Sequence, residues 1–358
     1  MSRFFDRSYD DMEEYIPGEQ PSDRKYIKLN ANETSLPPSP KVLEAISEAE
    51  IMGMGQYSDP YCKKLREAIA EEYDVSPEQV FVGNGSDEVL SFCFLSFFGK
   101  ESKICFPDIT YYFYHTYSKT FGIDALEIPL KEDFTIDIED YKKTERHVII
   151  ANPNAPTGYR LGRRELREVI EARKDRLVII DEAYVDYGNE SCVSLLKECP
   201  NLIVIQTFSK SRNLAGLRLG FALASEEIIA DMNRIKFTFN PYNLSALTIA
   251  AGAAAIKDRE YYKGCIRETI KIREDTAARL SELGFSIMES HTNFLFVRHP
   301  EIPALEYYRS LKKEGILSRH FNGERIKEYL RITIGTGEEM EEVIKATKKI
   351  LQLSEAGS

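Results

Sequence analysis

The chain has 358 residues, of which 43% are hydrophobic and 29% charged, and its formal net charge at pH 7 is −11. This length suits one large and one smaller domain, and the composition excludes a disordered or fibrous protein. The negative charge argues against nucleic acid or an anionic membrane surface as the main partner, so an anionic ligand must be met by local arginines.

The sequence offers no membrane or metal signal. Residues 1–20 mix acidic, aromatic and basic side chains without the apolar core of a signal peptide, and no apolar run is long enough to span a bilayer. The six cysteines lack CxxC spacing, and the five histidines lack the spacing of metal ligands. We therefore expect a cytoplasmic protein with reduced thiols, no membrane partner and no metal.

The chain opens with two short segments, at residues 15–21 (YIPGEQP) and 27–33 (IKLNANE). The two prolines and the glycine of the first predict an extended arm rather than a helix. The second is a short alternating piece. A helical pattern follows at 38–52, and after a loop that contains Tyr57 comes a second amphipathic helix that includes Leu65, Ala68 and Ile69.

Residues 80–88 (VFVGNGSDE) read as a strand, a glycine turn and a helix start. Backbone N–H groups and the helix dipole at such a turn can hold an anion, and Ser86 adds a hydroxyl. The GxGxxG pattern is incomplete because Glu88 stands in place of its last glycine, and a Gly-Asn-Gly turn alone is usually only a turn. Gly85, Ser86 and Asp87 become a predicted anion cradle once other residues imply a phosphate.

Residues 104–114 (ICFPDITYYFY) form a strand end that enters an aromatic-rich helix. A flat ring bound at this strand end would require an aromatic face against it, and Tyr111 is the candidate. We expect Tyr112 and Tyr114 only to pack. The next strand and loop, at 147–158 (HVIIANPNAPTG), bring Asn154 to the same edge.

A buried-type strand at residues 177–184 (LVIIDEAY) ends in a carboxylate. An aspartate held against a pyridine nitrogen keeps it protonated, so that the ring can accept electrons from a deprotonated α-carbon. Asp181 stands in that place, and the phenol of Tyr184 could hydrogen-bond a ring hydroxyl. Taken alone, Asp-Glu after a strand is more often an ordinary helix start.

The apolar run that begins at residue 202 stops at Thr207, Ser209 and Lys210, and Arg218 follows. Burial of a lysine favours the neutral amine, which can form a Schiff base with an aldehyde, although most lysines are simply solvated. The two hydroxyls and the arginine suit a phosphate monoester. An aldehyde that also carries a phosphate is pyridoxal phosphate.

Strands and helical patterns alternate along most of the chain, with helices expected at 163–173, 226–235 and 244–256. This order predicts a mixed, mostly parallel sheet with helices on both faces. Ligands gather at the carboxyl ends of such strands, where we place Tyr111, Asn154, Asp181 and Lys210. A long polar helix at 259–283 then leads to a smaller domain.

These motifs resemble those of the fold-type I pyridoxal-phosphate aminotransferases, most closely the histidinol-phosphate aminotransferase branch. The resemblance implies an N-terminal arm at 1–36, a large cofactor-binding domain at 37–257 and a small α/β domain at 258–358. It implies pyridoxal 5′-phosphate as cofactor, with a small-molecule amino donor and a 2-oxo acid as substrates. The reaction implied is transamination of L-histidinol phosphate with 2-oxoglutarate to imidazole acetol phosphate and glutamate, in histidine biosynthesis.

The resemblance also assigns roles beyond the strand ends. Tyr15 of the arm would reach the substrate phosphate, or else pack the arm down. Tyr57 would cross a homodimer interface to the neighbouring cofactor phosphate, and Tyr111 would stack on the pyridine ring. Arg331 would grip a substrate carboxylate and Arg319 the substrate phosphate.

Asn30 completes the predicted substrate-binding set, and one position departs from the family pattern. Many relatives have an asparagine immediately before Pro-Thr-Gly that donates to the ring hydroxyl, but here that residue is Ala155. Either Asn154 reaches across, or Tyr184 serves the ring hydroxyl with less help.

Three other activities remain open on sequence. An aromatic amino-acid aminotransferase would use the same residues, and threonine-phosphate decarboxylase is similar in its arm and arginines. A regulator that senses pyridoxal phosphate is the non-enzyme alternative, but such regulators fuse this fold to a DNA-binding domain.

Overall fold

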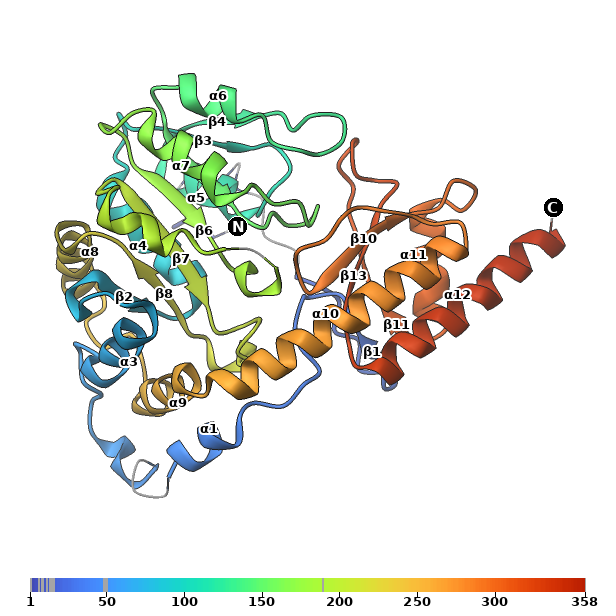
Figure 1. Ribbon diagram of the computed structural model, residues 1–358, viewed down its shortest axis with the longest axis horizontal. Helices are drawn as coiled ribbons and strands as arrows, with labels where there is room; N and C mark the ends of the chain where they lie inside the picture. The colour runs from blue at the N-terminus through green and yellow to red at the C-terminus, as the bar shows by residue number, and fades with distance from the viewer. Residues whose placement is uncertain are drawn as a thin grey trace.

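The computed structural model describes residues 2–5, 7, 10, 12, 17–47, 51–188 and 190–357. Within them the largest sheet has seven strands in the order β2-β8-β7-β6-β5-β3-β4 (Figure 1). Its strands are β2 (Val80–Gly83), β3 (Lys103–Pro107), β4 (Asp124–Ile128), β5 (His147–Ala151), β6 (Val178–Asp181), β7 (Leu202–Thr207) and β8 (Gly220–Leu223). β8 runs antiparallel to both of its neighbours and the other pairs are parallel, which confirms the predicted mixed sheet.

Helices cover both faces of this sheet, because alternate residues of its strands enter different cores. In β6, Val178 and Ile180 belong to one core and Ile179 to the other. Strands buried on both faces read as continuous apolar runs, as these do. The helices of this part are α1 (Pro40–Ala45), α3 (Lys63–Tyr73), α4 (Gly85–Phe97), α5 (Phe113–Phe121), α6 (Ile138–Lys143), α7 (Arg163–Glu171), α8 (Glu226–Phe239) and α9 (Ala246–Lys257).

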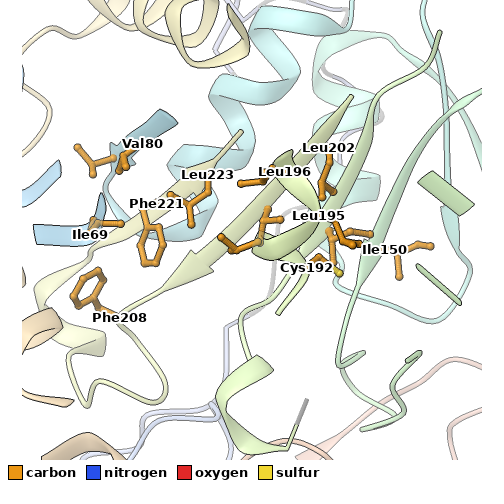
Figure 2. Close-up of a cluster of buried hydrophobic side chains, with 14 of the residues drawn as sticks. Ile69, Val80, Ile150, Cys192, Leu195, Leu196, Leu202, Phe208, Phe221 and Leu223 are labelled. Carbon is orange, nitrogen blue, oxygen red and sulfur yellow. The ribbon is translucent and has the colours of Figure 1, made fainter. Parts of the chain in front are cut away.

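The first core joins α3, α7 and α9 to one face of the sheet, while α4, α5 and α8 pack on the opposite face. Figure 2 shows part of the first core, where Phe208 meets Phe221 edge to face with ring centroids 5.7 Å apart. Phe208 lies two residues before Lys210. The loop that carries this lysine is therefore anchored in the core.

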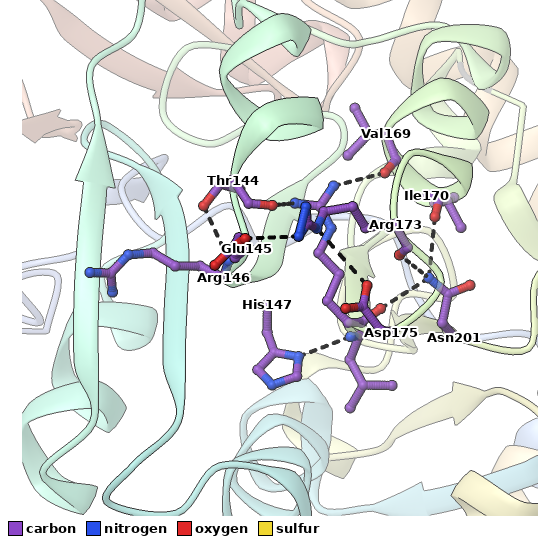
Figure 3. Close-up of polar contacts among 11 residues, drawn as sticks. Thr144, Glu145, Arg146, His147, Val169, Ile170, Arg173, Asp175 and Asn201 are labelled. Atoms are coloured by element: carbon purple, nitrogen blue, oxygen red, sulfur yellow. Dashed lines mark hydrogen bonds and ion pairs between the residues drawn. The ribbon is translucent and has the colours of Figure 1, made fainter.

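Polar contacts tie together the amino ends of the central strands, at the edge opposite Lys210 (Figure 3). The side-chain amide of Asn201, just before β7, donates to the carbonyls of Ile170 and Arg176 at 3.2 and 3.0 Å. Arg176 donates in turn to the carbonyl of Thr144 at 2.6 Å. This network fixes the strands at one end and leaves the other end to the functional site.

The long helix α10 (Arg259–Glu282) leads from the large sheet to a smaller part of the molecule (Figure 1). There a four-stranded antiparallel sheet has the order β12-β13-β10-β9, and β1 pairs with β11 beside it. The elements are β1 (Ile27–Lys28), β9 (Ser286–Ile287), β10 (Phe294–Arg298), α11 (Ala304–Lys313), β11 (Ile316–Leu317), β12 (Arg319–His320), β13 (Leu330–Thr333) and α12 (Gly337–Gly357). The segment after β1 thus lies between the two sheets.

The helix predicted at 38–52 is interrupted. α1 ends at Ala45, and Ile46 leaves helical geometry with φ −86° and ψ 69°. Within α1 only Val42 is buried, while Leu43 is 65% exposed. Because a short helix depends on packing of its apolar face, one buried residue gives it little support.

Candidate active site

A cavity of about 390 Å³ opens at the carboxyl ends of the central parallel strands. Ala151 ends β5, Asp181 ends β6 and Thr207 ends β7, and all three line it. Lys210 and Tyr184 complete the wall on the same side. The strand ends that the sequence separates by up to 56 residues are therefore brought together as predicted.

Two glycines shape one end of the cavity. Gly85 begins α4 with φ +78°, a conformation that other residues adopt at a cost. A Cβ on Gly220 would lie 2.4 Å from the backbone carbon of Gly85 and from the backbone nitrogen of Ser86. β8 thus passes very close to the start of α4. The first turn of α4 has unpaired N–H groups, and two of its residues, Ser86 and Asp87, line the cavity.

Hydroxyls and one guanidinium surround this helix start. Thr207 donates its hydroxyl to Ser209 at 3.0 Å, and both residues line the cavity. Arg218 adopts φ +52° and donates to the Asp87 carboxylate at 3.0 Å. The arginine is half exposed, so this pair leaves donors of Arg218 that can turn toward an anion in the cavity.

Glu88, which breaks the glycine pattern, supports the turn from behind. Its carboxylate accepts the backbone N–H of Asn84 at 2.6 Å and the side-chain amide of Asn243 at 2.7 Å. These bonds hold the residue that precedes α4. The substitution for glycine therefore belongs to the scaffold and not to the cavity.

The carboxylate of Asp181 is buried at the opposite end of the cavity, with 4% of the residue exposed. It accepts the Tyr114 hydroxyl at 2.7 Å and the Ala183 N–H at 3.2 Å, and within the described residues it forms no ion pair. Burial raises its pKa to about 6, although both hydrogen bonds oppose the rise. The site therefore favours a cationic partner for this carboxylate.

An aromatic wall stands between these two ends. Tyr111 donates to Asp87 at 2.5 Å and packs edge-on against Tyr114, with ring centroids 5.6 Å apart. Burial and the nearby Asp87 hold the pKa of Tyr111 well above its usual range, so it stays a neutral phenol. Tyr111 can present a flat face to a ring in the cavity.

Lys210 lies beside Tyr184, and its backbone is held by the residues that follow it. The Lys210 Nζ lies 5.7 Å from the centroid of the Tyr184 ring. The next two residues, Ser211 and Arg212, both donate to the carboxylate of Asp186, the arginine at 2.5 Å. This largely buried ion pair fixes the backbone on which the lysine stands.

Comparison with known proteins gives the family. Residues 24–346 match the family model described as aminotransferase class I and II. The histidinol-phosphate aminotransferase of Brachyspira hyodysenteriae is 47% identical over 353 residues, which cover 98% of this chain and 100% of that protein. The chain belongs to the class I and II aminotransferase family.

Solved structures agree with this assignment. The crystal structure of the histidinol-phosphate aminotransferase from Clostridium acetobutylicum has a TM-score of 0.83 at 26% identity, covering 90% of this chain and 98% of that one. The enzyme from Sinorhizobium meliloti, solved in complex with pyridoxal-5′-phosphate, has a TM-score of 0.88 at 22% identity and 98% coverage of both chains. The predicted α/β fold of a fold-type I transferase is confirmed.

Three predicted substrate residues of this aminotransferase, Asn30, Arg319 and Arg331, do not line the cavity. Arg319 and Arg331 face each other across β12 and β13 as register partners. Arg331 donates to the carbonyl of Asn30 at 3.1 Å and lies over the ring of Phe294, 5.5 Å from its centroid. Asn30 precedes Ala31, which does line the cavity.

The predicted Tyr57 does not line this chain's own cavity. Tyr57 is 84% exposed and stacks on Tyr242 with centroids 4.6 Å apart. Tyr15 lies outside the described residues.

Asn154 is committed to its own loop. Its amide group donates to the carbonyl of Ile109 at 2.9 Å and to the hydroxyl of Thr157 at 3.0 Å, and its oxygen accepts from Thr110 at 2.7 Å. It is buried and does not line the cavity, whereas Ala155 does. In this arrangement Asn154 has no amide hydrogen left for a ligand.

Two residues of the aminotransferase site escape the sequence patterns. Tyr114, expected only to pack, also donates its hydroxyl to Asp181. Its place three residues after Tyr111 was the available signal, because the turn that starts α5 brings the two residues together, with the Tyr114 N–H donating to the Tyr111 carbonyl at 3.3 Å. Asn32 donates to the hydroxyl of Tyr184 at 2.8 Å, across 152 residues of sequence, and no local pattern indicates this contact.

Within the described ranges, no group of three histidine, cysteine or acidic side chains is placed to hold a metal ion. Over the same residues, no helix combines the length and apolar character needed to cross a membrane.

Proposed function

We propose that this aminotransferase transfers the amino group of L-histidinol phosphate to 2-oxoglutarate, giving imidazole acetol phosphate and glutamate in histidine biosynthesis. The relative from B. hyodysenteriae, 47% identical along the whole chain, bears the corresponding name. The buried Asp181 carboxylate, which lines the same cavity as Lys210, carries the proposal, because it calls for a cation beside an amine.

The cavity fits pyridoxal phosphate. The turn at Gly85, where an added Cβ would meet the Arg218 guanidinium at 2.7 Å, has the donors for the phosphate. Asp181 at the other end suits the protonated ring nitrogen. Tyr111 would cover one face of the ring, and Lys210 would hold the aldehyde.

When bound, this cofactor supplies a cationic ring that takes up the electron pair left at the substrate's α-carbon. Asp181 would keep the proton on the ring nitrogen, and Tyr114 and the Ala183 N–H hold its carboxylate in place. The Lys210 amine would take the proton from the α-carbon and return one to the cofactor's aldehyde carbon, acting first as base and then as acid. Tyr184 would donate to the ring hydroxyl.

Substrate anions would be met by the pair Arg319 and Arg331, with Tyr15 and Asn30 beside them. The two arginines are register partners on neighbouring strands, so one anion between them could meet both guanidinium groups. The planar guanidinium of Arg331 suits the glutamate carboxylate. The same group would also have to bind the phosphate of histidinol phosphate.

A homodimer with Tyr57 placed in the partner's cavity belongs to the same proposal. Tyr57 is highly exposed and does not line its own chain's cavity, and several other large apolar side chains are also exposed. They include Leu43, Met52, Met54, Tyr61, Phe239 and Tyr242. The proposal includes domain boundaries at 36/37 and 257/258. It also places the protein in a reducing cytoplasm, because its six cysteines are free thiols.

The first test is turnover of histidinol phosphate with 2-oxoglutarate by the wild type and by Lys210→Ala. We expect ping-pong kinetics, and loss of at least about 10³-fold in kcat for the variant, which removes both the covalent anchor and the base. Lys210→Ala should still bind the cofactor non-covalently through Arg218 and Asp181. Turnover that survives in Lys210→Ala would contradict the assigned role.

A further inference from the structure

Asn32 joins three separate segments at the cavity wall. It is 2% exposed and adopts φ +54°, the left-handed conformation. Its backbone N–H donates to the Thr333 hydroxyl at 3.0 Å, and its carbonyl accepts from Asn293 at 3.0 Å. Its side-chain amide donates to the Tyr184 hydroxyl at 2.8 Å.

The hydrogen bonds run in one direction. Because the Thr333 oxygen accepts the Asn32 N–H, its own proton is free to donate to Asn32 Oδ1, 3.2 Å away. This orients the amide with Nδ2 toward Tyr184. The phenol oxygen therefore accepts from Asn32, and the phenolic proton must point elsewhere.

The cavity is where that proton points. Tyr184 lines the cavity, and no described residue accepts its proton. The ring itself is fixed, because Phe294 packs edge-on against it at 5.4 Å. Phe294 is the register partner of Thr333, so one strand pair holds both the ring and the amide that orients its hydroxyl.

The neighbouring wall supplies no substitute donor. Ala155 packs in the same small cluster as Tyr184 but has no polar side-chain atom. Asn154, next to it, uses its amide group within its own loop. Of Ala155, Asn154 and Tyr184, only Tyr184 has a donor available to a ligand oxygen in the cavity.

We propose that Asn32 is a positioning residue that holds Tyr184 as a hydrogen-bond donor to an anionic ligand oxygen, the ring oxygen of the cofactor. The inference rests on the cofactor named in the proposed function. Successive bonds from Thr333 through Asn32 to Tyr184 polarise one another and strengthen the last donation. A donor to an anionic oxygen favours its deprotonated form.

The test is a pH titration of the visible absorption of the cofactor-loaded protein. Asn32→Gly removes the side chain at a position where glycine costs no backbone strain. We expect it to raise the midpoint pH of the absorption change by about one pH unit, the effect of one charge-assisted hydrogen bond. Asn32→Asp should raise it further, because the carboxylate accepts the phenolic proton and turns it away from the cavity.

A double-mutant cycle shows whether Asn32 acts through Tyr184. The midpoint of Asn32→Gly with Tyr184→Phe should equal that of Tyr184→Phe alone. Full additivity of the two shifts, or no shift in Asn32→Gly, would overturn the inference. If the glycine variant does not fold, the near-isosteric Asn32→Asp takes its place in the cycle.

Asn201→Ala is the matched control, because it removes a buried asparagine at the opposite ends of the strands. It should lower the melting temperature and leave the titration unchanged. A normal titration without turnover of histidinol phosphate would contradict the proposed substrate and leave this inference standing. A protein that binds no cofactor would overturn both.

Discussion

Asp181 illustrates how one side chain can be unfavourable in the empty protein and useful in the loaded one. Its folded pKa is raised from 3.8 to about 6, chiefly by burial. The contribution of Asp181 to stability is therefore fully present below pH 3.8 and is lost as the pH rises through about 6. A protonated ring nitrogen beside the carboxylate would relieve this cost.

This behaviour predicts a pH-dependent effect of the cofactor on stability. Without cofactor, Asp181→Asn should be more stable than the wild type at pH 8, by about 3 kcal/mol at most, and should melt at a higher temperature. At pH 5 the stability gained by this substitution should be smaller. Added cofactor should raise the melting temperature of the wild type more at pH 8 than at pH 5, and Asp181→Asn should lose most of that difference.

Glu182→Gln is the control for Asp181. Burial also raises the pKa of Glu182, to about 7, but its carboxylate is bound by Ser191, Cys192 and Gln206 and does not line the cavity. It should alter the pH dependence of the empty protein without altering the cofactor effect. If both variants lost the pH dependence of the cofactor effect equally, the proposed contact between Asp181 and the cofactor would be contradicted.

At the residue scale, sequence predicts the groups whose chemistry is unusual for their position. Lys210 and Asp181 end buried strands, where a charged side chain is costly, so each is noticeable by itself. Asn32 is an ordinary asparagine in a short segment, and its role depends on Thr333 and Tyr184, which lie far along the chain. Such a contact becomes visible only when the fold brings the segments together.

At the scale of elements, buried strands were the most predictable part. β5, β6 and β7 are continuous apolar runs, and the ends expected from sequence at Ile150, Asp181 and Ile205 lie within two residues of those observed. The helix expected at 38–52 is confirmed only in part, as α1 and at residues 51–52, and of its apolar positions within α1 only Val42 is buried. Pattern identifies an element when tertiary burial follows the pattern.

The segment at 321–329, between β12 and β13, contacts the large part of the molecule through Arg325 and through Ile326 and Tyr329, which pack against its core. Arg325 donates to Asp108 at 2.8 Å and to the carbonyls of Leu130 and Lys131, both at 2.7 Å. Its guanidinium also lies 5.6 Å from the centroid of the Phe134 ring. This arginine joins the small part of the molecule to the ends of β3 and β4.

Arg325→Ala should therefore loosen the segment at 321–329. We expect amide hydrogen exchange there to increase about 5- to 30-fold, corresponding to about 1–2 kcal/mol for charge-assisted bonds at a partly exposed site. Lys327→Ala is the control within the same segment, because its pair with Glu324 at 2.7 Å is exposed and local. Equal exchange in the two variants would mean that Arg325 does not hold the segment.

At the scale of the whole molecule, the position of Tyr57 predicts active sites shared between two chains. Co-expression of Tyr57→Ala with Lys210→Ala would produce hybrid dimers in which one site has both an intact Lys210 and a partner's Tyr57. About a quarter of wild-type activity should return, since half of randomly formed dimers carry one intact site. Activity no higher than that of the separate variants, or a monomer in sedimentation, would place Tyr57 outside the partner's site.

The most direct test of the central claim is a half-reaction without keto acid. Histidinol phosphate, phenylalanine and threonine phosphate are added separately to the loaded protein while its visible absorption is followed. The account predicts conversion of the cofactor to its amino form by histidinol phosphate at far lower concentration than by phenylalanine. Equal conversion by phenylalanine, or release of carbon dioxide from threonine phosphate with the original spectrum restored, would contradict it.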